Sequence, residues 1–166
     1  KAGWLQSGSL GLFQDESYER DAVGNVTSIT DAGLEPGYTY SNTKECFVYD
    51  QGNRLVRAHS TASSGTCATD TTGAVSVGTN APYDQTWTYD DINRMTSHNS
   101  LVTPTNTASY NYSTTGHPHA VSSITGGGGG TGSYAYNANG AMTTKPGGTL
   151  VYDAQQRLTS FTGVNS

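Results

Sequence analysis

Charged residues are scarce in this chain: Asp, Glu, Lys and Arg together make up 13% of its 166 residues, and the formal net charge is −5. The eight Lys and Arg residues are scattered and form no basic stripe, which argues against a nucleic-acid partner. Apolar residues reach only 33%, and no window approaches the roughly 18 consecutive apolar residues of a membrane span. The sequence therefore predicts neither a nucleic-acid-binding protein nor a membrane-spanning one.

Turn-forming and β-forming residues are abundant. The chain holds 21 Gly and 11 Tyr, with many Thr and Ser residues. Tyr and Thr suit a half-buried pleated surface, and Gly supplies the positive φ angles that tight turns require. This composition predicts an all-β fold with many turns.

A short phrase returns along the chain. It consists of an aromatic or aliphatic residue, a spacer, usually Tyr, then Asp, two variable residues, an Asn, Gly or Gln, a basic or polar residue, and an aliphatic one. Four fuller copies occupy residues 18–26, 47–55, 87–95 and 150–158, and two weaker copies occupy 110–116 and 134–142. A returning unit predicts a repeat architecture.

Each copy is predicted to form a β-hairpin, because alternating segments flank a turn. The hairpins are expected near 18–30, 47–60, 87–100, 110–124, 134–145 and 150–162, within a single segment that covers 1–166, with loops at 58–82 and 126–132. The spacing of turn positions varies from 16 residues (Asn137 to Asp153) to 40 (Asp50 to Asp90). Such variation favours hairpins joined by variable loops over a solenoid of fixed rung length.

The turns are predicted from Asp and from the residue three positions later. Asp accepts hydrogen bonds from nearby backbone amides, and Gly or Asn tolerates the left-handed conformation of a compact hairpin loop. The predicted structural turn residues are Asp21, Gly24, Asp50, Asn53, Asp90, Asn93, Gly116, Asn137, Gly140 and Asp153. Gln156 departs from this rule, so its turn is the least regular of the set.

The tyrosines and aliphatic residues of the phrase are expected to touch across each hairpin. The aliphatic position lies five residues after the Asp, or after its substitute, and all copies should place it on the same face of the return strand. The expected cross-strand contacts join Tyr49, Tyr89, Tyr112, Tyr136 and Tyr152 to the set Val26, Leu55, Met95, Met142 and Leu158.

Two cysteines, Cys46 and Cys67, flank a polar stretch. The Thr-rich and Tyr-rich composition is typical of an exported protein, so a disulfide between the two cysteines, which closes the loop between them, is the favoured interpretation. Two free thiols are the alternative. A metal site is disfavoured because the pair lacks the short spacing of zinc ligands.

Other groupings give weak signals for chemistry. The set comprises a metal-binding pair at His117 and His119, a calcium or glycosidase-like acidic group of Asp84, Asp90 and Asp91, a carbohydrate platform of Trp4 and Trp87, and a phosphate loop at 126–130. Turn, packing and linker roles explain these residues more simply, since the Gly run lacks the Lys and the helix of a phosphate site. We therefore predict no catalytic residues, no bound metal and no cofactor.

The phrases at 47–55, 87–96 and 150–160 resemble the YD repeats of RHS-repeat proteins, and residues 116–124 resemble a segment near the end of bacterial arrays. The resemblance covers about residues 18–161. It implies hairpins that spiral into part of a YD-repeat shell, as in bacterial RHS polymorphic toxins, wall-associated proteins, toxin-complex subunits and the animal teneurins. The chain contains no Asp-Pro dipeptide and no self-cleavage core of the bacterial pattern, so autoproteolysis and toxin chemistry are not expected from it.

The resemblance implies a structural role rather than an enzymatic one. The expected function is a shell segment, cut from a longer secreted or cell-surface protein, that encapsulates or displays an effector domain. Its partners would be the rest of the shell and the C-terminal effector. The alternative is an adhesin-type module whose outward loops, such as 58–82, bind a glycan or a cell-surface partner.

Overall fold

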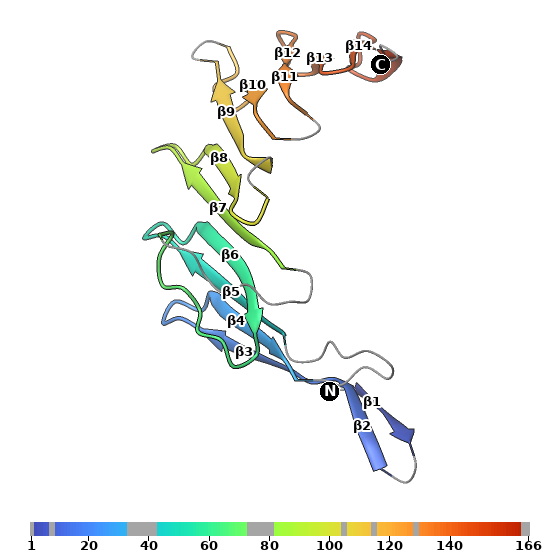
Figure 1. The fold of residues 1–166 in the computed structure, drawn as a ribbon. Coiled ribbons are helices and arrows are strands. Elements are labelled where there is room, and N and C mark those ends of the chain that lie inside the picture. The colour runs from blue at the N-terminus through green and yellow to red at the C-terminus, as the bar shows by residue number, and fades with distance from the viewer. Residues whose placement is uncertain are drawn as a thin grey trace. The chain divides into compact units, whose positions relative to one another are not determined.

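The structure is a computed structural model that describes residues 2–6, 9–32, 43–72, 82–103, 106–113, 116–127 and 130–163, with the backbone alone up to Gln14. Within these ranges there is no α-helix, and neighbouring strands pair in the antiparallel sense. The predicted all-β fold built from repeated hairpins is therefore confirmed (Figure 1). In the same ranges, no helix has the length and hydropathy needed to cross a membrane.

The strands follow one another as successive hairpins. They are β1 (Ala2–Gln6), β2 (Ser9–Gln14), β3 (Glu16–Arg20), β4 (Val26–Asp31), β5 (Thr43–Tyr49), β6 (Leu55–Ala62), β7 (Asp84–Tyr89), β8 (Met95–Ser100), β9 (Ala108–Tyr112), β10 (Val121–Thr125), β11 (Gly132–Ser133), β12 (Ala135–Tyr136), β13 (Met142–Lys145), β14 (Gly148–Tyr152) and β15 (Leu158–Gly163). The chain divides into two compact units, Lys1–Trp87 with Ser100–Val102, and Thr88–Asn99 with Thr103–Ser166. Strands β7 and β8 have residues in both units.

The first unit contains the β1–β2 hairpin and an antiparallel sheet in the order β3-β4-β5-β6-β7. One row of directly opposed residues crosses this sheet, and its members are Glu19, Ser28, Cys46, His59 and Asp84. Opposed residues share a face. The sheet therefore has a mainly polar row on this face, with Cys46 at its centre.

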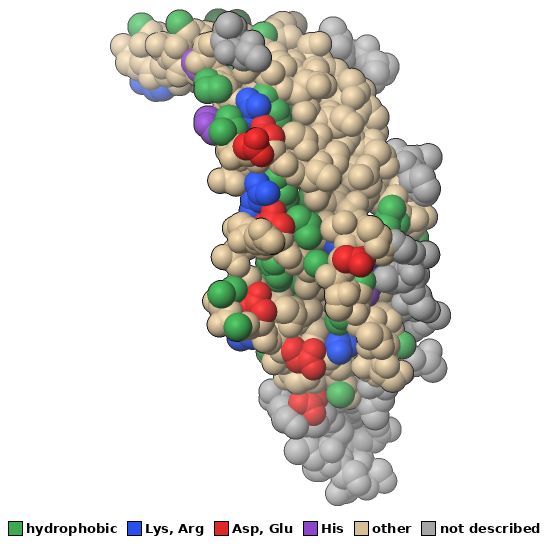
Figure 2. Space-filling model, turned by 90° about the vertical axis from the view of Figure 1, so that its left-hand side faces the viewer, with side chains coloured by type: hydrophobic (Ala, Val, Ile, Leu, Met, Phe, Trp, Pro, Cys, Tyr) green, Lys and Arg blue, Asp and Glu red, His purple; other side chains and the backbone are tan. Residues whose placement is uncertain are grey.

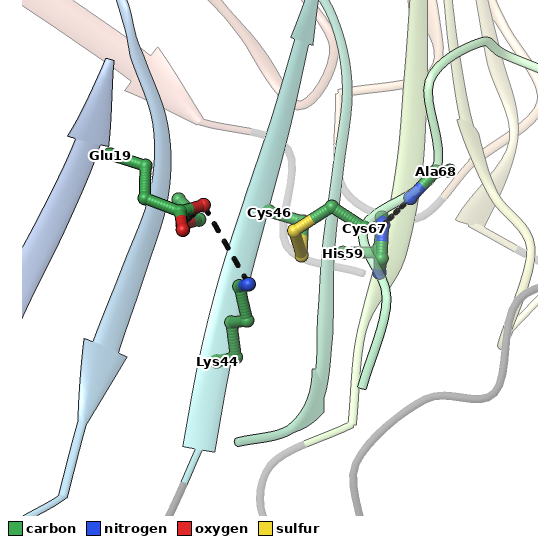
Figure 3. Close-up of a disulfide and its surroundings, with 7 residues drawn as sticks. Glu19, Lys44, Cys46, His59, Cys67 and Ala68 are labelled. Carbon is green, nitrogen blue, oxygen red and sulfur yellow. Dashed lines mark hydrogen bonds and ion pairs between the residues drawn. A yellow bond between two sulfur atoms is a disulfide. The ribbon is translucent and has the colours of Figure 1, made fainter. Parts of the chain in front are cut away.

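The segment 63–72 is tethered to this row. Cys67 is bonded to Cys46, with a Cα–Cα distance of 5.4 Å, and the Ala68 amide donates to His59 Nε2 at 3.1 Å (Figure 3). Burial lowers the pKa of His59, which keeps the ring neutral and leaves Nε2 able to accept this bond. The predicted disulfide therefore holds the loop against the sheet, and the free-thiol alternative does not apply, because the described residues contain no free cysteine.

A buried ion pair extends the tether. Arg57 and Asp84 form a two-pronged contact, Nε to Oδ1 at 2.9 Å and Nη2 to Oδ2 at 2.7 Å, with side chains 0% and 3% exposed. The remaining Nη1 of Arg57 donates to the carbonyls of Asp70 and Thr72 at 3.2 and 3.1 Å. A buried charge needs such complete pairing, because removal of one partner leaves the other desolvated.

The second unit continues the hairpins. Strand β10 pairs with both β9 and β11, and a separate sheet has the order β12-β13-β14-β15. The register of this sheet pairs Tyr136 with Met142 and Tyr152 with Leu158. Strand β15 is the edge of its sheet, so one side of its backbone has no strand beside it within the described chain.

The interior is polar. The described residues bury only Cys46, Ala58 and Ala108 among hydrophobic side chains, whereas Arg57, His59 and Asp84 belong to a larger buried polar set. Figure 2 shows one face of the molecule, where the few charged side chains and scattered hydrophobic ones lie among other side chains and backbone. The described part of this chain thus folds through hydrogen-bonded hairpins with few buried aliphatic side chains, in keeping with an apolar content of 33%.

Two expected loops begin or end inside strands. Strand β6 continues to Ala62, into the expected loop 58–82, because Ser60 and Thr61 pair with β5 and the Ser60 amide donates to the Tyr83 carbonyl at 2.9 Å. The expected loop 126–132 runs into β11, because Gly132 pairs with Ile124. Tertiary pairing extends these strands beyond what the polar composition indicates.

The disulfide gives the first prediction. Free-thiol titration of the denatured, non-reduced protein should find no reactive sulfhydryl, and reduction should lower the free energy of unfolding by about 3 kcal/mol, because the bridge closes a sequence separation of 21 residues. The paired variant Cys46→Ser/Cys67→Ser should have this lower stability without reductant and should not respond to it. A titratable thiol in the non-reduced protein would contradict the pairing.

Candidate functional site

The repeated turn is the most regular site in the chain. In five hairpins, the residue directly after the first strand makes two backbone hydrogen bonds across the turn. Its amide donates to the carbonyl of the residue four positions later, and its carbonyl accepts from the amide of the residue three positions later. These ten hydrogen bonds measure 2.9 to 3.1 Å and start from Asp21, Asp50, Asp90, Asn137 and Asp153. The pattern is that of a three-residue hairpin loop closed by a bulge.

The bulge residue has a positive φ in each of these turns. Gly24 and Gly140 have φ of 98° and 83°, and Asn53, Asn93 and Gln156 have φ of 59°, 66° and 60°. Gln156 therefore adopts the same conformation as the Asn residues, although its identity departs from the pattern. The side chain is held in place, because its Oε1 accepts from Asn137 Nδ2 of the neighbouring turn at 3.1 Å.

The predicted turn at Gly116 is built differently. Gly116 has a φ of 81°, but Tyr112 pairs with Val121, which makes this connection longer than the turn in which Tyr49 pairs with Leu55. The weaker sequence phrase at 110–116 thus ends in a larger loop rather than the compact turn.

The Asp carboxylate organises the turn through both oxygens. In the turn of Asp50, Oδ1 accepts from the Gly52 and Arg54 amides at 2.8 and 3.0 Å, while Oδ2 accepts from Arg54 Nε at 2.7 Å. The turns of Asp90 and Asp153 repeat this arrangement with Arg94 and Arg157. From the sequence, the residue four positions after the Asp was described only as basic or polar. The recurrence of Arg four residues after Asp in three copies was the available signal.

These contacts shift the carboxyl pKa values downward. The pKa of Asp50 lies below its usual 3.8, first because of the Arg54 side chain and then because of the Arg54 amide, with partial desolvation acting in the opposite direction. The Arg157 amide is the largest cause that lowers the pKa of Asp153. Both turns therefore favour the ionised carboxylate.

The tyrosines link neighbouring hairpins. The last residue of a hairpin's first strand donates its hydroxyl to the first carbonyl of the preceding hairpin's return strand. This bond joins Tyr49 to Val26 at 3.0 Å, Tyr112 to Met95 at 2.7 Å and Tyr136 to Val121 at 3.0 Å. Sequence reasoning placed these tyrosines in contacts within one hairpin and missed their hydroxyls, because the partner is a backbone atom of another copy.

The Arg of the preceding turn supports the same link. The Arg94 guanidinium carbon lies 4.7 Å from the centroid of the Tyr112 ring, while Arg94 Nη1 donates to the Pro118 carbonyl at 2.6 Å. Burial is the largest cause that raises the pKa of Tyr112, which keeps the hydroxyl protonated as a donor. A cation over an aromatic face adds a favourable contact. A single Arg therefore serves its own turn and the next hairpin.

The weaker sequence candidates have other places. Asp84 is paired with Arg57 and Asp90 with Arg94, Asp91 is exposed beside its turn, and His117 Nε2 lies 2.8 Å from the Asn137 carbonyl oxygen. Across the described ranges, no cluster of three His, Cys, Asp or Glu residues could hold a metal ion. Trp87 is half-buried in β7, the side chain of Trp4 lies outside the described residues, and so do residues 128–129 of the Gly run.

An open cavity of about 300 Å³ lies beside the disulfide, lined by Phe47, Tyr49, Cys67, Thr69 and neighbouring residues. Its one carboxylate, Asp21, is already engaged by the Val23 and Asn25 amides at 3.1 and 2.8 Å. The hydrogen bonds and ion pairs of these turns therefore stabilise the hairpins, and the charged side chains of the turns are already engaged in these contacts.

Comparison with known proteins gives a consistent result. The model of a family described as teneurin YD-shell matches residues 10–165. The chain is also similar to a chain of the crystal structure of TcdB2-TccC3-Cdc42, with 22% identity and a TM-score of 0.59, over 92% of this chain and 8% of that chain. No curated protein matches. At this identity the structural likeness concerns the fold, and the chain spans less than a tenth of the length of the solved one.

The positive φ angles give a second prediction. Gly24→Val should destabilise the protein by on the order of 1 kcal/mol or more, because a β-branched residue is strained at a φ of 98°. Gly24→Asn is the matched control and should cost less, since Asn53 and Asn93 occupy the same place in their turns. Thermal and urea unfolding would measure both, and equal stability of the Val and Asn variants would contradict this account of the turn.

The low carboxyl pKa values give a third prediction. Because the folded pKa lies below the unfolded value, the contribution of these turns is full above about pH 5 and is lost as the pH falls through 3.8 and the folded pKa. Urea unfolding between pH 6 and pH 2 should show this decline. The variant Asp50→Asn/Asp153→Asn keeps the amide-accepting oxygen, as Asn137 does, and should show a shallower decline. Parallel curves for the two proteins would contradict the assignment.

Proposed function

Because this chain belongs to the teneurin YD-shell family, we propose that it is a non-catalytic wall segment of a larger shell, in which all of its hairpins form one repeat segment. The shell is secreted or displayed at a cell surface, and it encloses or presents an effector domain carried elsewhere in the same protein. The partners of the segment are then the rest of the shell and that effector.

The observation that carries this proposal is the use of the repeated side chains. Asp, Arg and Tyr residues of the phrase bind backbone or one another, either within a hairpin, as Asp50 and Arg54 do, or between neighbouring hairpins, as Tyr49 and Tyr112 do. These contacts join one hairpin to the next along a wall. They also engage the charged side chains of the turns in structural hydrogen bonds and ion pairs. A catalytic pair of carboxylates would instead need to converge on a cleft without being consumed by turns.

The polar interior also supports a wall. A sheet with water or cargo on each face does not need the aliphatic core that a compact domain requires. Only three hydrophobic side chains are buried in the described part of the chain. Hydrogen bonds and one disulfide-tethered loop stabilise the sheet instead. This pattern suits a thin wall better than a self-contained globule.

Protection of the effector tests the proposal. In the complete protein that carries this segment, limited proteolysis should leave the effector region intact while the shell is closed. Asp90→Ala removes the acceptor of two turn amides and of Arg94 and should speed cleavage of the effector region several-fold. Asp91→Ala changes the adjacent exposed carboxylate and should leave the cleavage rate unchanged.

Equal cleavage in the unaltered, Asp90→Ala and Asp91→Ala proteins would contradict enclosure. Binding of the isolated segment to glycans or cells, lost in Trp87→Ala, would instead favour the adhesin alternative. No binding in that assay, together with protection of the effector region, supports the shell.

A further inference from the structure

We propose that residues 67–72 form a strap over the sheet of β5, β6 and β7 that opens only when the Cys46–Cys67 disulfide is reduced and His59 is also protonated. One covalent bond and several hydrogen bonds hold the strap, and each condition removes one of these contacts. This inference goes beyond the proposed function, because the strap lies within the first unit and needs no other part of a shell.

The strap is held from below by buried side chains. It is irregular and belongs to no strand, and residues 69–72 are exposed. Its contacts on the sheet come from Cys46 of β5 and from Arg57 and His59 of β6, each of which is 0% exposed. Figure 3 shows the disulfide and the hydrogen bond to His59 next to each other. The strap therefore depends on the chemical state of the groups beneath it.

The contact with His59 requires a neutral ring. A neutral imidazole carries its proton on one ring nitrogen and accepts at the other. Because Nε2 of His59 accepts from the Ala68 amide at 3.1 Å, this nitrogen is the unprotonated one. A proton there would set a second donor against the amide and would place a charge on a side chain that is 0% exposed. Protonation of His59 and closure of the strap therefore exclude each other.

The surrounding charges leave the closed ring neutral. The ionisable groups on the same face of the three strands and in the strap are Lys44 on β5, Arg57 on β6, Asp84 on β7 and Asp70 in the strap. The Asp84 carboxylate attracts a proton to His59, but it is paired with Arg57, which repels one. Burial is the largest cause and lowers the pKa of His59 below its ordinary 6.5.

The disulfide makes the release conditional. Cys67 directly precedes Ala68, so the intact bridge holds the Ala68 amide beside His59. Cys67 lines the open cavity of about 300 Å³, whereas Cys46 is 0% exposed, so a dithiol reductant attacks at Cys67.

The reduction takes two steps. In the first, a thiolate of the reductant bonds to Cys67 Sγ, and Cys46 leaves as a thiolate that takes up a proton. In the second, the other thiol of the reductant displaces Cys67, which also ends as a thiol, and the reductant becomes a disulfide. The strap is then no longer covalently attached to the sheet.

Reduction alone leaves the strap closed at neutral pH. Neutral His59 still accepts the Ala68 amide, and Arg57 still donates to two strap carbonyls at 3.2 and 3.1 Å. Arg57 keeps its charge at every pH considered, because a guanidinium does not lose its proton in proteins. Acid then removes the His59 contact, and the released ring takes its charge in water. The strap opens, and water reaches the polar row beneath it.

Hydrogen exchange of the Ala68 amide in the full chain tests the strap at pH 7.5 and pH 5.0, before and after reduction by a dithiol at pH 7.5. The released ring has a pKa of about 6.5 and the closed ring a lower pKa, so the open strap binds more protons and is favoured as the pH falls. In the reduced protein, the protection factor should fall by about 30-fold between the two pH values. The oxidised protein should keep its protection at both.

A matched pair of variants separates the ring from the acid. His59→Gln keeps a side-chain acceptor that does not titrate, so the reduced variant should hold the strap closed at both pH values. His119→Gln changes an exposed histidine and should behave as the unaltered protein does. Amides of β9 and β10, in the second unit, serve as the internal reference and should keep their protection throughout.

A second measurement needs no variant. Because opening and protonation are linked, reduction should raise the pKa of His59 toward 6.5 in a nuclear magnetic resonance titration of the unaltered protein, and the pKa of His119 should not change. An unchanged His59 titration, or Ala68 protection that does not depend on pH in the reduced protein, would overturn the proposal. So would an equal fall in the reduced His59→Gln variant, or a simultaneous loss of protection in β9 and β10, which would indicate unfolding of the whole chain.

Discussion

The Asp or Asn side chain that follows the first strand of five hairpins is the constraint on which their turns depend. One oxygen of Asp50 accepts two backbone amides of the turn, and the other holds the Arg54 side chain. A compact loop leaves these amides without strand partners, and an unpaired backbone donor costs free energy wherever water is excluded. The carboxylate satisfies them with the atoms of a single residue, so the turn is specified locally and can be copied.

The fixed turn then sets the contact between copies. In the five compact turns the loop length is constant, so the residue before the Asp or Asn ends its strand and the residue five positions after it begins the return strand. The acceptor carbonyls of Val26 and Met95 both begin a return strand after such a turn, and Tyr49 and Tyr112 bind them in the same way, although the loops between these hairpins differ in length. The repeat tolerates irregular spacing because its contacts are made at the turn end of each hairpin, and the linkers lie elsewhere.

The sequence predicted the parts of the structure that are local. The all-β fold, the resemblance to YD-repeat proteins and the disulfide needed only composition, the returning phrase and two cysteines. The turn bonds of Asp50 lie within four residues, so one copy of the phrase contains them. The pairing of Arg57 with Asp84, 27 residues apart, has no such local signal, and the tyrosine hydroxyls bind a backbone atom that no side-chain pattern reveals. Gln156 seemed irregular because its partner, Asn137, belongs to another turn.

The tyrosine bond also gives the wall a direction. Each such bond runs from a later hairpin to an earlier one, whereas the β14–β15 hairpin is joined to its predecessor by the pairing of β13 with β14 and by the contact of Asn137 with Gln156. The β3–β4 hairpin lacks the tyrosine, because Arg20 stands there and turns back to its own loop. In the β14–β15 hairpin, Arg157 still binds Asp153 although its side chain is 76% exposed, so the turn bonds do not depend on a covering tyrosine. Neighbouring hairpins are therefore joined in more than one way, and the tyrosine bond is used where the hydroxyl reaches the carbonyl that begins the preceding return strand.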